Sequence, residues 1–162
     1  NAGIIERKFV VDHELVDWQK QFQVNLFAAA QIATACFPLL KNTAPSTVVN
    51  VSSSLGVRPI PECAAYSASK AAMNNWTQTL ALEWAAHGVT ANAICPGIVD
   101  TPIHQLDEHP EAKEIQQSMH AAHPIGRMGT AQEVAENILF LCSESSHGRT
   151  GSIQVLDGGI SL

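Results

Sequence analysis

Apolar residues recur at steps of three and four positions from about residue 12, the pattern of a helix with one buried face. These positions are Leu15, Trp18, Phe22, Leu26, Ala29, Ile32, Ala33 and Phe37, with Pro38 near the expected end. A second helix is predicted over residues 64–86, which contain no Gly or Pro and precede Gly88. A third is predicted from the N-cap Thr130 to about residue 141, with Glu133 completing a capping box.

Short β-branched or apolar runs at residues 47–51, 89–95 and Ile153–Leu156 predict strands between these helices. The first is expected to be buried on both faces. Residues 1–5 look like the end of a further strand, and the polar, His-rich segment 100–123 is expected to be a mobile, partly helical excursion. Strands alternating with helices indicate an α/β fold, a parallel sheet covered on both faces, in a single domain over 1–162.

The composition is that of a soluble globular domain, with 46% hydrophobic and 15% charged residues. A net charge of -6, with nine scattered Lys and Arg, does not favour nucleic acid as a partner. The longest uninterrupted apolar runs, such as residues 26–30, are shorter than a membrane helix, and no signal peptide is recognised. We therefore expect a cytoplasmic protein.

Four cysteines lie far apart, without a C-x-x-C pair: Cys36, Cys63, Cys95 and Cys142. This spacing favours reduced, mostly buried thiols over a disulfide framework. His120 and His123 are close in sequence, but no Cys or carboxylate pattern completes a site with normal ligand spacing. No metal is predicted, and exposed loop histidines are the expected explanation.

Tyr66 and Lys70 are the first candidates for chemistry. They are four residues apart on a predicted helix, so both side chains project from one face. A phenol with a pKa near 10 exchanges protons at neutral pH only when a nearby cation stabilises its anion, and an ammonium can do this. The same spacing also fits a tyrosine packed on a lysine stem.

Three motifs in order and register make the chemical interpretation specific. They are Val-Asn-Val-Ser-Ser-Ser-Leu-Gly ending at Gly56, Tyr-Ser-Ala-Ser-Lys-Ala-Ala beginning at Tyr66, and Asn-Ala-Ile-Cys-Pro-Gly-Ile-Val-Asp-Thr-Pro ending at Pro102. Together they resemble the short-chain dehydrogenase/reductase family. The resemblance implies a Rossmann-like, doubly wound parallel sheet and NAD or NADP as cofactor.

The resemblance places the catalytic serine at Ser53, thirteen residues before Tyr66, where its hydroxyl would stabilise charge on the substrate oxygen. Ser53 could instead bond its own loop backbone. Asn25 lies twenty-eight residues before Ser53 in an apolar helix, and the resemblance implies that it holds a water linking Lys70 to solvent. Alternatively, or at the same time, its amide satisfies a local helix irregularity.

The cofactor residues are also assigned by resemblance. Asn1, Ala2 and Gly3 are similar to the end of the family's Asn-Asn-Ala-Gly motif beside the adenosine ribose, and Tyr66 and Lys70 are expected at the nicotinamide ribose. Four further residues are expected against the nicotinamide: Pro96, Gly97, Ile98 and Thr101. Gly97 would allow close approach of backbone to cofactor. Segments 123–129 and 155–159 are similar to the family's C-terminal third and are expected to have architectural and subunit-contact roles.

The family's first strands and Gly-rich pyrophosphate turn are missing from this sequence. By comparison with an ordinary doubly wound domain, roughly 80 to 90 residues are absent. We expect that these 162 residues belong to a longer native chain whose N-terminal part was lost, disordered or omitted. A chain starting at Asn1 would lack dehydrogenase activity, because most of the dinucleotide site would be gone.

The resemblance implies hydride transfer between a nicotinamide and a secondary alcohol or ketone, with the loop 101–123 closing over a small-molecule substrate. It also implies a dimer or tetramer, a homotetramer being the expected form. Two alternatives remain open. One is a catalytically silent relative acting as an interaction protein, and the other is a 3-oxoacyl-carrier-protein reductase. The latter would need a basic docking patch, which Arg58 and Arg127 alone do not supply.

Overall fold

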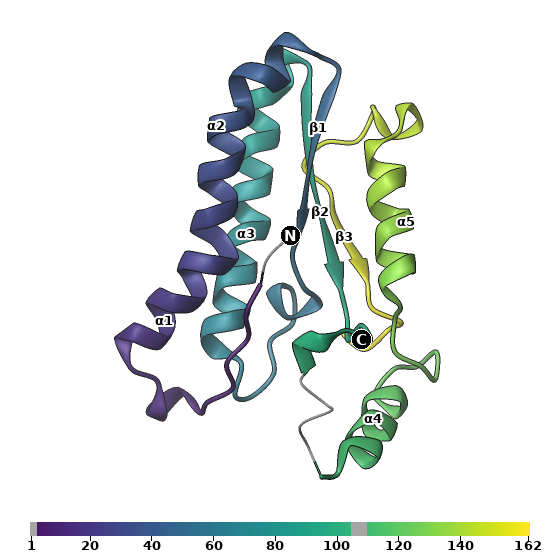
Figure 1. Cartoon of the computed structure of the whole chain (residues 1–162). Helices are drawn as coiled ribbons and strands as arrows, with labels where there is room; N and C mark the ends of the chain where they lie inside the picture. Colours follow the sequence, from purple (N-terminus) through teal and green to yellow (C-terminus); the bar gives the residue numbers. More distant parts are fainter. Residues whose placement is uncertain (1–2, 105–109) are drawn as a thin grey trace.

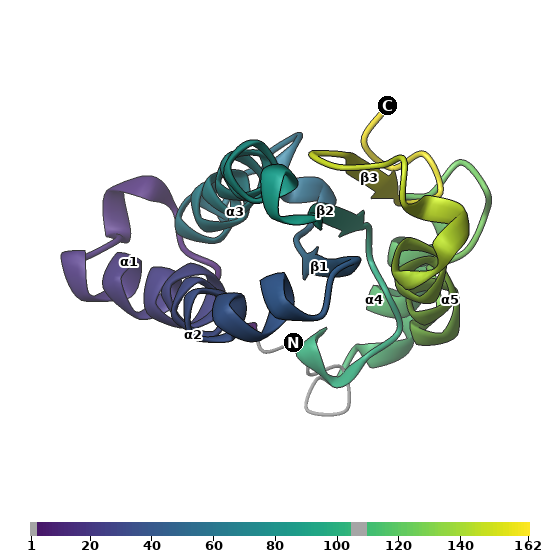
Figure 2. The same ribbon diagram turned by 90° about the horizontal axis from the view of Figure 1, so that it is seen from above.

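The computed structural model describes residues 3–104 and 110–162. Three parallel strands form one sheet in the order β1-β2-β3, where β1 is Ser46–Val51, β2 is Val89–Pro96 and β3 is Ile153–Leu156. Helices α1 (Leu15–Phe22), α2 (Ala28–Asn42) and α3 (Ala64–Trp84) cover one face, and α5 (Ala131–Cys142) covers the other (Figures 1 and 2). The predicted α/β class, with a parallel sheet between helical layers, is confirmed.

The central strand β2 carries the core. All of its residues except Thr90 are buried, and α3 packs along it. The α2–α3 end of the core is closed by a stacked pair, Phe37 and Trp84, with ring centroids 4.5 Å apart. Strand β1 is only half-buried for most of its length, so the expectation that it is buried on both faces was wrong. The physical reason is that, in the described sheet, β1 pairs with β2 alone and forms an edge.

The first helical stretch begins a few residues later than predicted and ends, as predicted, near Pro38. It begins at Leu15 because the Asp17 carboxylate accepts the Glu14 backbone N–H at 2.9 Å, which caps the helix. It continues past Pro38 to Asn42, where Thr43 Oγ1 donates to the Leu39 carbonyl at 2.9 Å. A proline removes one ladder bond without ending a helix whose other turns remain packed.

This stretch bears on the expectation of no membrane-spanning segment, which stays a prediction. The helices α1 and α2 and the π-helical turn between them, Gln23–Phe27, are continuous over 28 residues, Leu15–Asn42. By length and composition alone the stretch could cross a membrane, although core helices of soluble proteins meet the same criterion. It carries several exposed apolar side chains. They are Leu15, Val16, Phe27, Ile32 and Leu39.

The remaining elements largely follow the sequence. Helix α3 ends in a 3-10 turn, Ala85–His87, and Gly88 takes the left-handed conformation that stops it, with φ of 71°. Helix α5 has the predicted capping box, in which Thr130 Oγ1 accepts the Glu133 N–H at 3.1 Å. Within segment 100–123, Pro102–His104 is a 3-10 turn and α4 is Ala112–Ala121, while residues 105–109 lie outside the described residues. The remaining 3-10 turns are Val10–Asp12, Ser54–Gly56 and Glu144–Ser146.

The N-terminal run and the buried polar residues depart from expectation. The described part of that run, from Gly3, belongs to no strand, because Ile4 pairs with the Asn25 side chain instead of with β1.

All four cysteines are free, but only Cys63 and Cys95 are buried. His123 is 3% exposed and not a surface loop residue, since its Nδ1 bonds the Met119 carbonyl at 2.7 Å.

Candidate functional site

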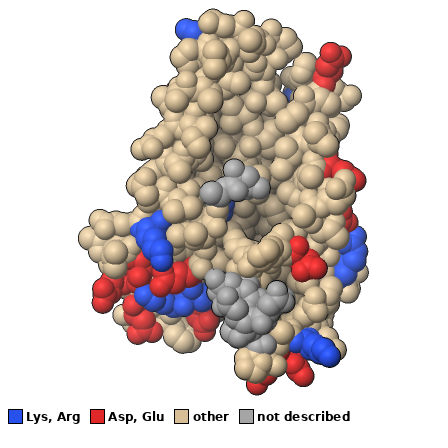
Figure 3. Space-filling view, viewed as in Figure 1, with Lys and Arg blue, Asp and Glu red and all other residues tan. Residues whose placement is uncertain are grey.

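The candidate site lies where the carboxyl ends of β1 and β2 meet the first turns of α3. All three strand arrowheads in Figure 1 point to this edge of the sheet. Parallel pairing of Val51 with Ile94 brings the serine cluster after β1 beside the end of β2. In such folds the ligand crevice opens at the carboxyl edge of the sheet. The surface is hollowed on this side, between the α2–α3 layer and α5 (Figure 3).

Tyr66 and Lys70 are buried together at the start of α3, with 8% and 3% of their surfaces exposed. Lys70 Nζ lies 5.9 Å from the centre of the Tyr66 ring and donates a hydrogen bond to the Val51 carbonyl at 2.9 Å. Burial disfavours the charged ammonium and lowers the pKa of Lys70 to about 8. The lysine therefore joins the end of β1 to the tyrosine ring.

The electrostatics of Tyr66 differ from the sequence expectation. Burial raises its pKa above the ordinary value, and a side-chain hydrogen bond with Ser53 lowers it only in part. The neighbouring thiols of Cys63 and Cys95 raise it further. The pKa of Tyr66 is thus raised overall in this chain because desolvation dominates, and its lowering by Lys70 stays a prediction.

Ser53 makes the loop-backbone contact that was considered as its alternative role. Its Oγ accepts the Leu55 backbone N–H at 3.1 Å and so caps the 3-10 turn Ser54–Gly56. A side-chain interaction with Ser53 also lowers the pKa of Tyr66, against the larger effect of burial. The neighbouring Ser52 instead donates to the Lys70 carbonyl at 3.1 Å. The fold thus brings Ser53, Tyr66 and Lys70 together, as the motif order predicts.

Asn25 occupies the π-helical turn and is fully buried. Its Oδ1 accepts the Ile4 N–H at 2.9 Å, and its Nδ2 donates to the Ile4 carbonyl at 2.9 Å and to Ser69 Oγ at 3.1 Å. The amide therefore binds the N-terminal segment and α3, whereas the helix-irregularity interpretation required a partner within its own helix. A Cβ on Gly3 would lie 3.7 Å from Asn25 Oδ1 and 4.0 Å from Lys70 Nζ, so Gly3 borders the site.

The other expected cofactor residues lie around the end of β2. Asn1 and Ala2 lie outside the described residues. Pro96 ends β2, and a Cβ on the following Gly97 would meet Asp157 Cα at 2.9 Å, so this glycine is needed for protein packing, whatever it allows toward a ligand. The Ile98 carbonyl accepts the Gly129 N–H at 2.9 Å, and Thr101 Oγ1 donates to the Val99 carbonyl at 3.2 Å.

Sequence reasoning missed a second polar layer beneath Ser53. Asn74 Nδ2 donates to the Gly56 carbonyl at 3.3 Å, and Asn74 Oδ1 accepts from Cys95 Sγ at 3.5 Å. The signal was present, because Asn74 follows Lys70 by one helical turn on the same face of α3. Among residues 3–104 and 110–162, no group of three or more His, Cys, Asp or Glu is arranged to hold a metal ion.

An α/β parallel sheet with polar residues at its carboxyl edge defines the class as Rossmann-like. A family model described as enoyl-(acyl carrier protein) reductase matches residues 1–161. A tropinone reductase homologue of Arabidopsis thaliana is 32% identical over 162 residues, which are 100% of this chain and 60% of the relative. A 3-oxoacyl-[acyl-carrier-protein] reductase of Thermotoga maritima is 34% identical over 160 residues, which are 99% of this chain and 63% of that reductase.

A solved structure, ElxO with NADP bound, superposes with a TM-score of 0.89 at 26% identity and covers 99% of this chain and 64% of that one. The chain belongs to the short-chain dehydrogenase/reductase family. It spans about 60% of the length of the curated relatives that it matches.

Proposed function

We propose that the protein containing this chain is an oxidoreductase that transfers a hydride between NAD or NADP and a secondary alcohol or ketone. The observation that supports this most directly is the gathering of Ser53, Tyr66 and Lys70 at the carboxyl edge of the sheet. The NADP-bound neighbour supports a nicotinamide cofactor. The nicotinamide supplies the hydride acceptor or donor at its C4, and the residues of this chain manage the proton and the substrate oxygen.

In carbonyl reduction, the Tyr66 hydroxyl would donate its proton to the substrate oxygen as the hydride reaches the carbon. In alcohol oxidation, the Tyr66 phenolate would take the hydroxyl proton as the hydride leaves. Ser53 would hydrogen-bond the substrate oxygen and hold it against Tyr66. Lys70 would donate to the nicotinamide ribose with the N–H groups that the Val51 carbonyl does not use.

The residues around the site fit such a cofactor. Gly3 has no side chain next to Asn25 and Lys70, so a ligand could approach the Lys70 ammonium closely. Pro96, Gly97, Ile98 and Thr101 would line the nicotinamide, and the Gly3 backbone would lie beside the adenosine ribose. In the same proposal, Asn25 would order a water beside Lys70 as part of a proton path.

The test is Tyr66→Phe in the native protein that contains this chain. We expect turnover to fall about 10²- to 10⁴-fold, the range of general acid–base catalysis. The cofactor dissociation constant, measured by calorimetry, should stay nearly unchanged because the ring remains. Asn75→Ala, an exposed position on the same helix, serves as the control. Retained turnover in Tyr66→Phe would reject the mechanism, and absence of cofactor binding in the wild type would favour a silent relative.

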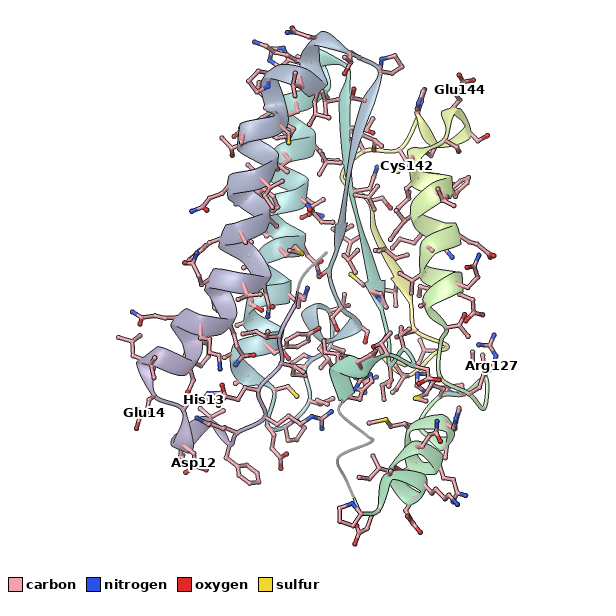
Figure 4. All side chains as sticks on the ribbon, viewed as in Figure 1. Asp12, His13, Glu14, Arg127, Cys142 and Glu144 are labelled. Atoms are coloured by element: carbon pink, nitrogen blue, oxygen red, sulfur yellow. The ribbon has the colours of Figure 1, made fainter. Side chains whose placement is uncertain are left out.

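The acyl-carrier-protein alternative has weaker support from surface charge. A protein with an acidic carrier partner needs a basic docking patch. Arg58 donates to the Ser161 carbonyl at 2.6 Å, and Arg127 is paired with Glu133 at 2.6 Å. Basic and acidic groups are intermixed on the face that Figure 3 shows. Arg127 lies beside the start of α5, and the charged turn at Asp12–Glu14 lies elsewhere on the molecule (Figure 4). Small-molecule substrates are therefore the favoured class.

We further propose a cytoplasmic homo-oligomer, a dimer or tetramer. Exposed apolar side chains on the α1–α2 and α3 layer support this assembly, among them Ile32, Leu39 and Leu82. Charged residues are sparse over α2 in Figure 3. Sedimentation analysis of the native protein tests the assembly, and a monomer at working concentration would contradict it.

A further inference from the structure

Three buried polar side chains lie beneath the Ser53 turn, and the mechanism proposed above does not use them. They come from three different elements: Ser52 follows β1, Asn74 is on α3 and Cys95 is on β2. Their exposed fractions are 4%, 8% and 0%. Buried polar groups are costly unless hydrogen-bonded, so a cluster of this kind at a site edge calls for a structural reason.

Asn74 is the residue that connects these elements. Its amide nitrogen donates to the Gly56 carbonyl at 3.3 Å, and its amide oxygen accepts from Cys95 Sγ at 3.5 Å. The Ser52 side chain and the Ser53 backbone also lower the pKa of the Cys95 thiol, against the larger effect of burial. Asn74 thus joins the end of β2 to the turn that follows β1.

The Gly56 end of this connection is rigidly linked to Ser53. The Gly56 N–H donates to the Ser53 carbonyl at 2.9 Å, and Ser53 Oγ caps the same turn through Leu55. The turn also lies directly on α3, because a Cβ at Gly56 would be 2.8 Å from the Lys70 carbonyl carbon. A shift of the Gly56 carbonyl must therefore move Ser53 relative to Tyr66 and Lys70.

We infer that Asn74 is a positioning residue for hydride transfer, which holds the Gly56 carbonyl so that the Ser53 side chain keeps its position relative to Tyr66 and Lys70. The inference rests on the proposed function and extends it by one residue. Asn74 touches neither substrate nor cofactor in this scheme. Its effect passes entirely through Ser53, and this dependence separates positioning from a general contribution to core stability.

The variants are Asn74→Leu, which removes donor and acceptor at similar volume, and Asn74→Ala, which serves if the leucine variant does not fold. Asn75→Leu is the matched control, because Asn75 is exposed on the same helix. In the native protein that contains this chain, the ionisation of Tyr66 can be followed as the difference in tyrosinate absorbance between each protein and its counterpart that carries Tyr66→Phe. This measurement needs neither substrate nor cofactor.

We expect Asn74→Leu to raise the pKa of Tyr66 by the same amount as Ser53→Ala, because both remove the hydrogen bond that lowers it. The double variant should show no further rise. Asn75→Leu should titrate like the wild type. A wild-type titration curve in folded Asn74→Leu and Asn74→Ala, or a rise that adds to that of Ser53→Ala, would overturn the inference.

Kinetics of the native protein provide the second readout. Loss of one oxyanion donor costs about 10²-fold or more in kcat, so Ser53→Ala sets the upper limit for Asn74→Leu. We expect Asn74→Leu to lower kcat at least about tenfold with cofactor KM unchanged. It should have no effect in the Ser53→Ala background, because residues in one network are not additive.

The outcomes separate the two proposals. If Tyr66→Phe and Ser53→Ala both retain turnover, the proposed function is wrong. If both lose turnover while Asn74→Leu keeps wild-type kcat, only the role of Asn74 is wrong.

Discussion

Replacing Gly56 with alanine tests whether the Ser53 turn must lie directly on α3. The added Cβ would lie 2.8 Å from the Lys70 carbonyl carbon and 3.0 Å from both the Ala71 nitrogen and Lys70 Cβ. Two of these atoms are backbone, so the clash cannot be relieved by rotating a side chain. The turn must instead move outward by a few tenths of an ångström, together with Ser53.

Overpacking of this kind costs about 1–3 kcal/mol. In a chain of this size, a loss of 1 kcal/mol in the free energy of unfolding lowers Tm by about 2–4 °C, so Gly56→Ala should melt about 2–12 °C below the wild type. The displaced turn also carries Ser53 away from Tyr66, so kcat of the native protein should fall more than cofactor KM changes.

Gly148→Ala is the matched control, because nothing lies within 4 Å of a Cβ at Gly148 and its backbone is not left-handed. That variant should be neutral or stabilised by up to about 1 kcal/mol, through the lower entropy of the unfolded chain. Differential scanning calorimetry compares the three proteins. Equal melting temperatures and equal kcat for both variants would refute the reasoning about the turn.

Three further substitutions test other parts of the structure by chemical denaturation. Asn25→Ala leaves the Ile4 N–H and carbonyl without partners and should cost about 2 kcal/mol, whereas an unchanged midpoint would show that water replaces the amide. Thr130→Ala removes the cap from Glu133 and should cost about 1 kcal/mol, which Thr130→Ser should largely restore. Lys70→Met should abolish a pH-dependent contribution to stability. Because the folded pKa of Lys70, about 8, lies below the unfolded value of 10.5, the wild type should gain stability relative to Lys70→Met as pH rises between these values. A constant difference between the two proteins over that range would contradict the lowered pKa.

The sequence predicted the elements whose signals are local. The strand Ile153–Leu156 and the capped helix after Thr130 appear with the predicted bounds or within one residue of them, because turn and cap chemistry determine such ends. The glycine stop at Gly88 is equally local. The grouping of Ser53, Tyr66 and Lys70 also followed from the motifs, since parallel strands bring their carboxyl ends to one edge.

The features that sequence reasoning missed depend on contacts between distant segments. Nothing in the sequence indicates that the Asn25 amide binds the Ile4 backbone, which lies 21 residues earlier. The raised pKa of Tyr66 likewise depends on burial, which periodicity on α3 alone does not give.

The raised pKa of Tyr66 changes how the site is best understood. At neutral pH the phenol keeps its proton in this chain, because its ordinary pKa is already near 10 and burial raises it further, with only partial offset from Ser53. A protonated phenol can donate to a carbonyl oxygen without prior ionisation, whereas alcohol oxidation needs the phenolate. The Ser53 hydrogen bond is therefore the contact within the chain that favours the phenolate, and every residue that fixes Ser53 influences the proton equilibrium. For this reason the turn at Gly56 and the Asn74 side chain that anchors it bear on the chemistry, although neither of them reaches the reacting atoms.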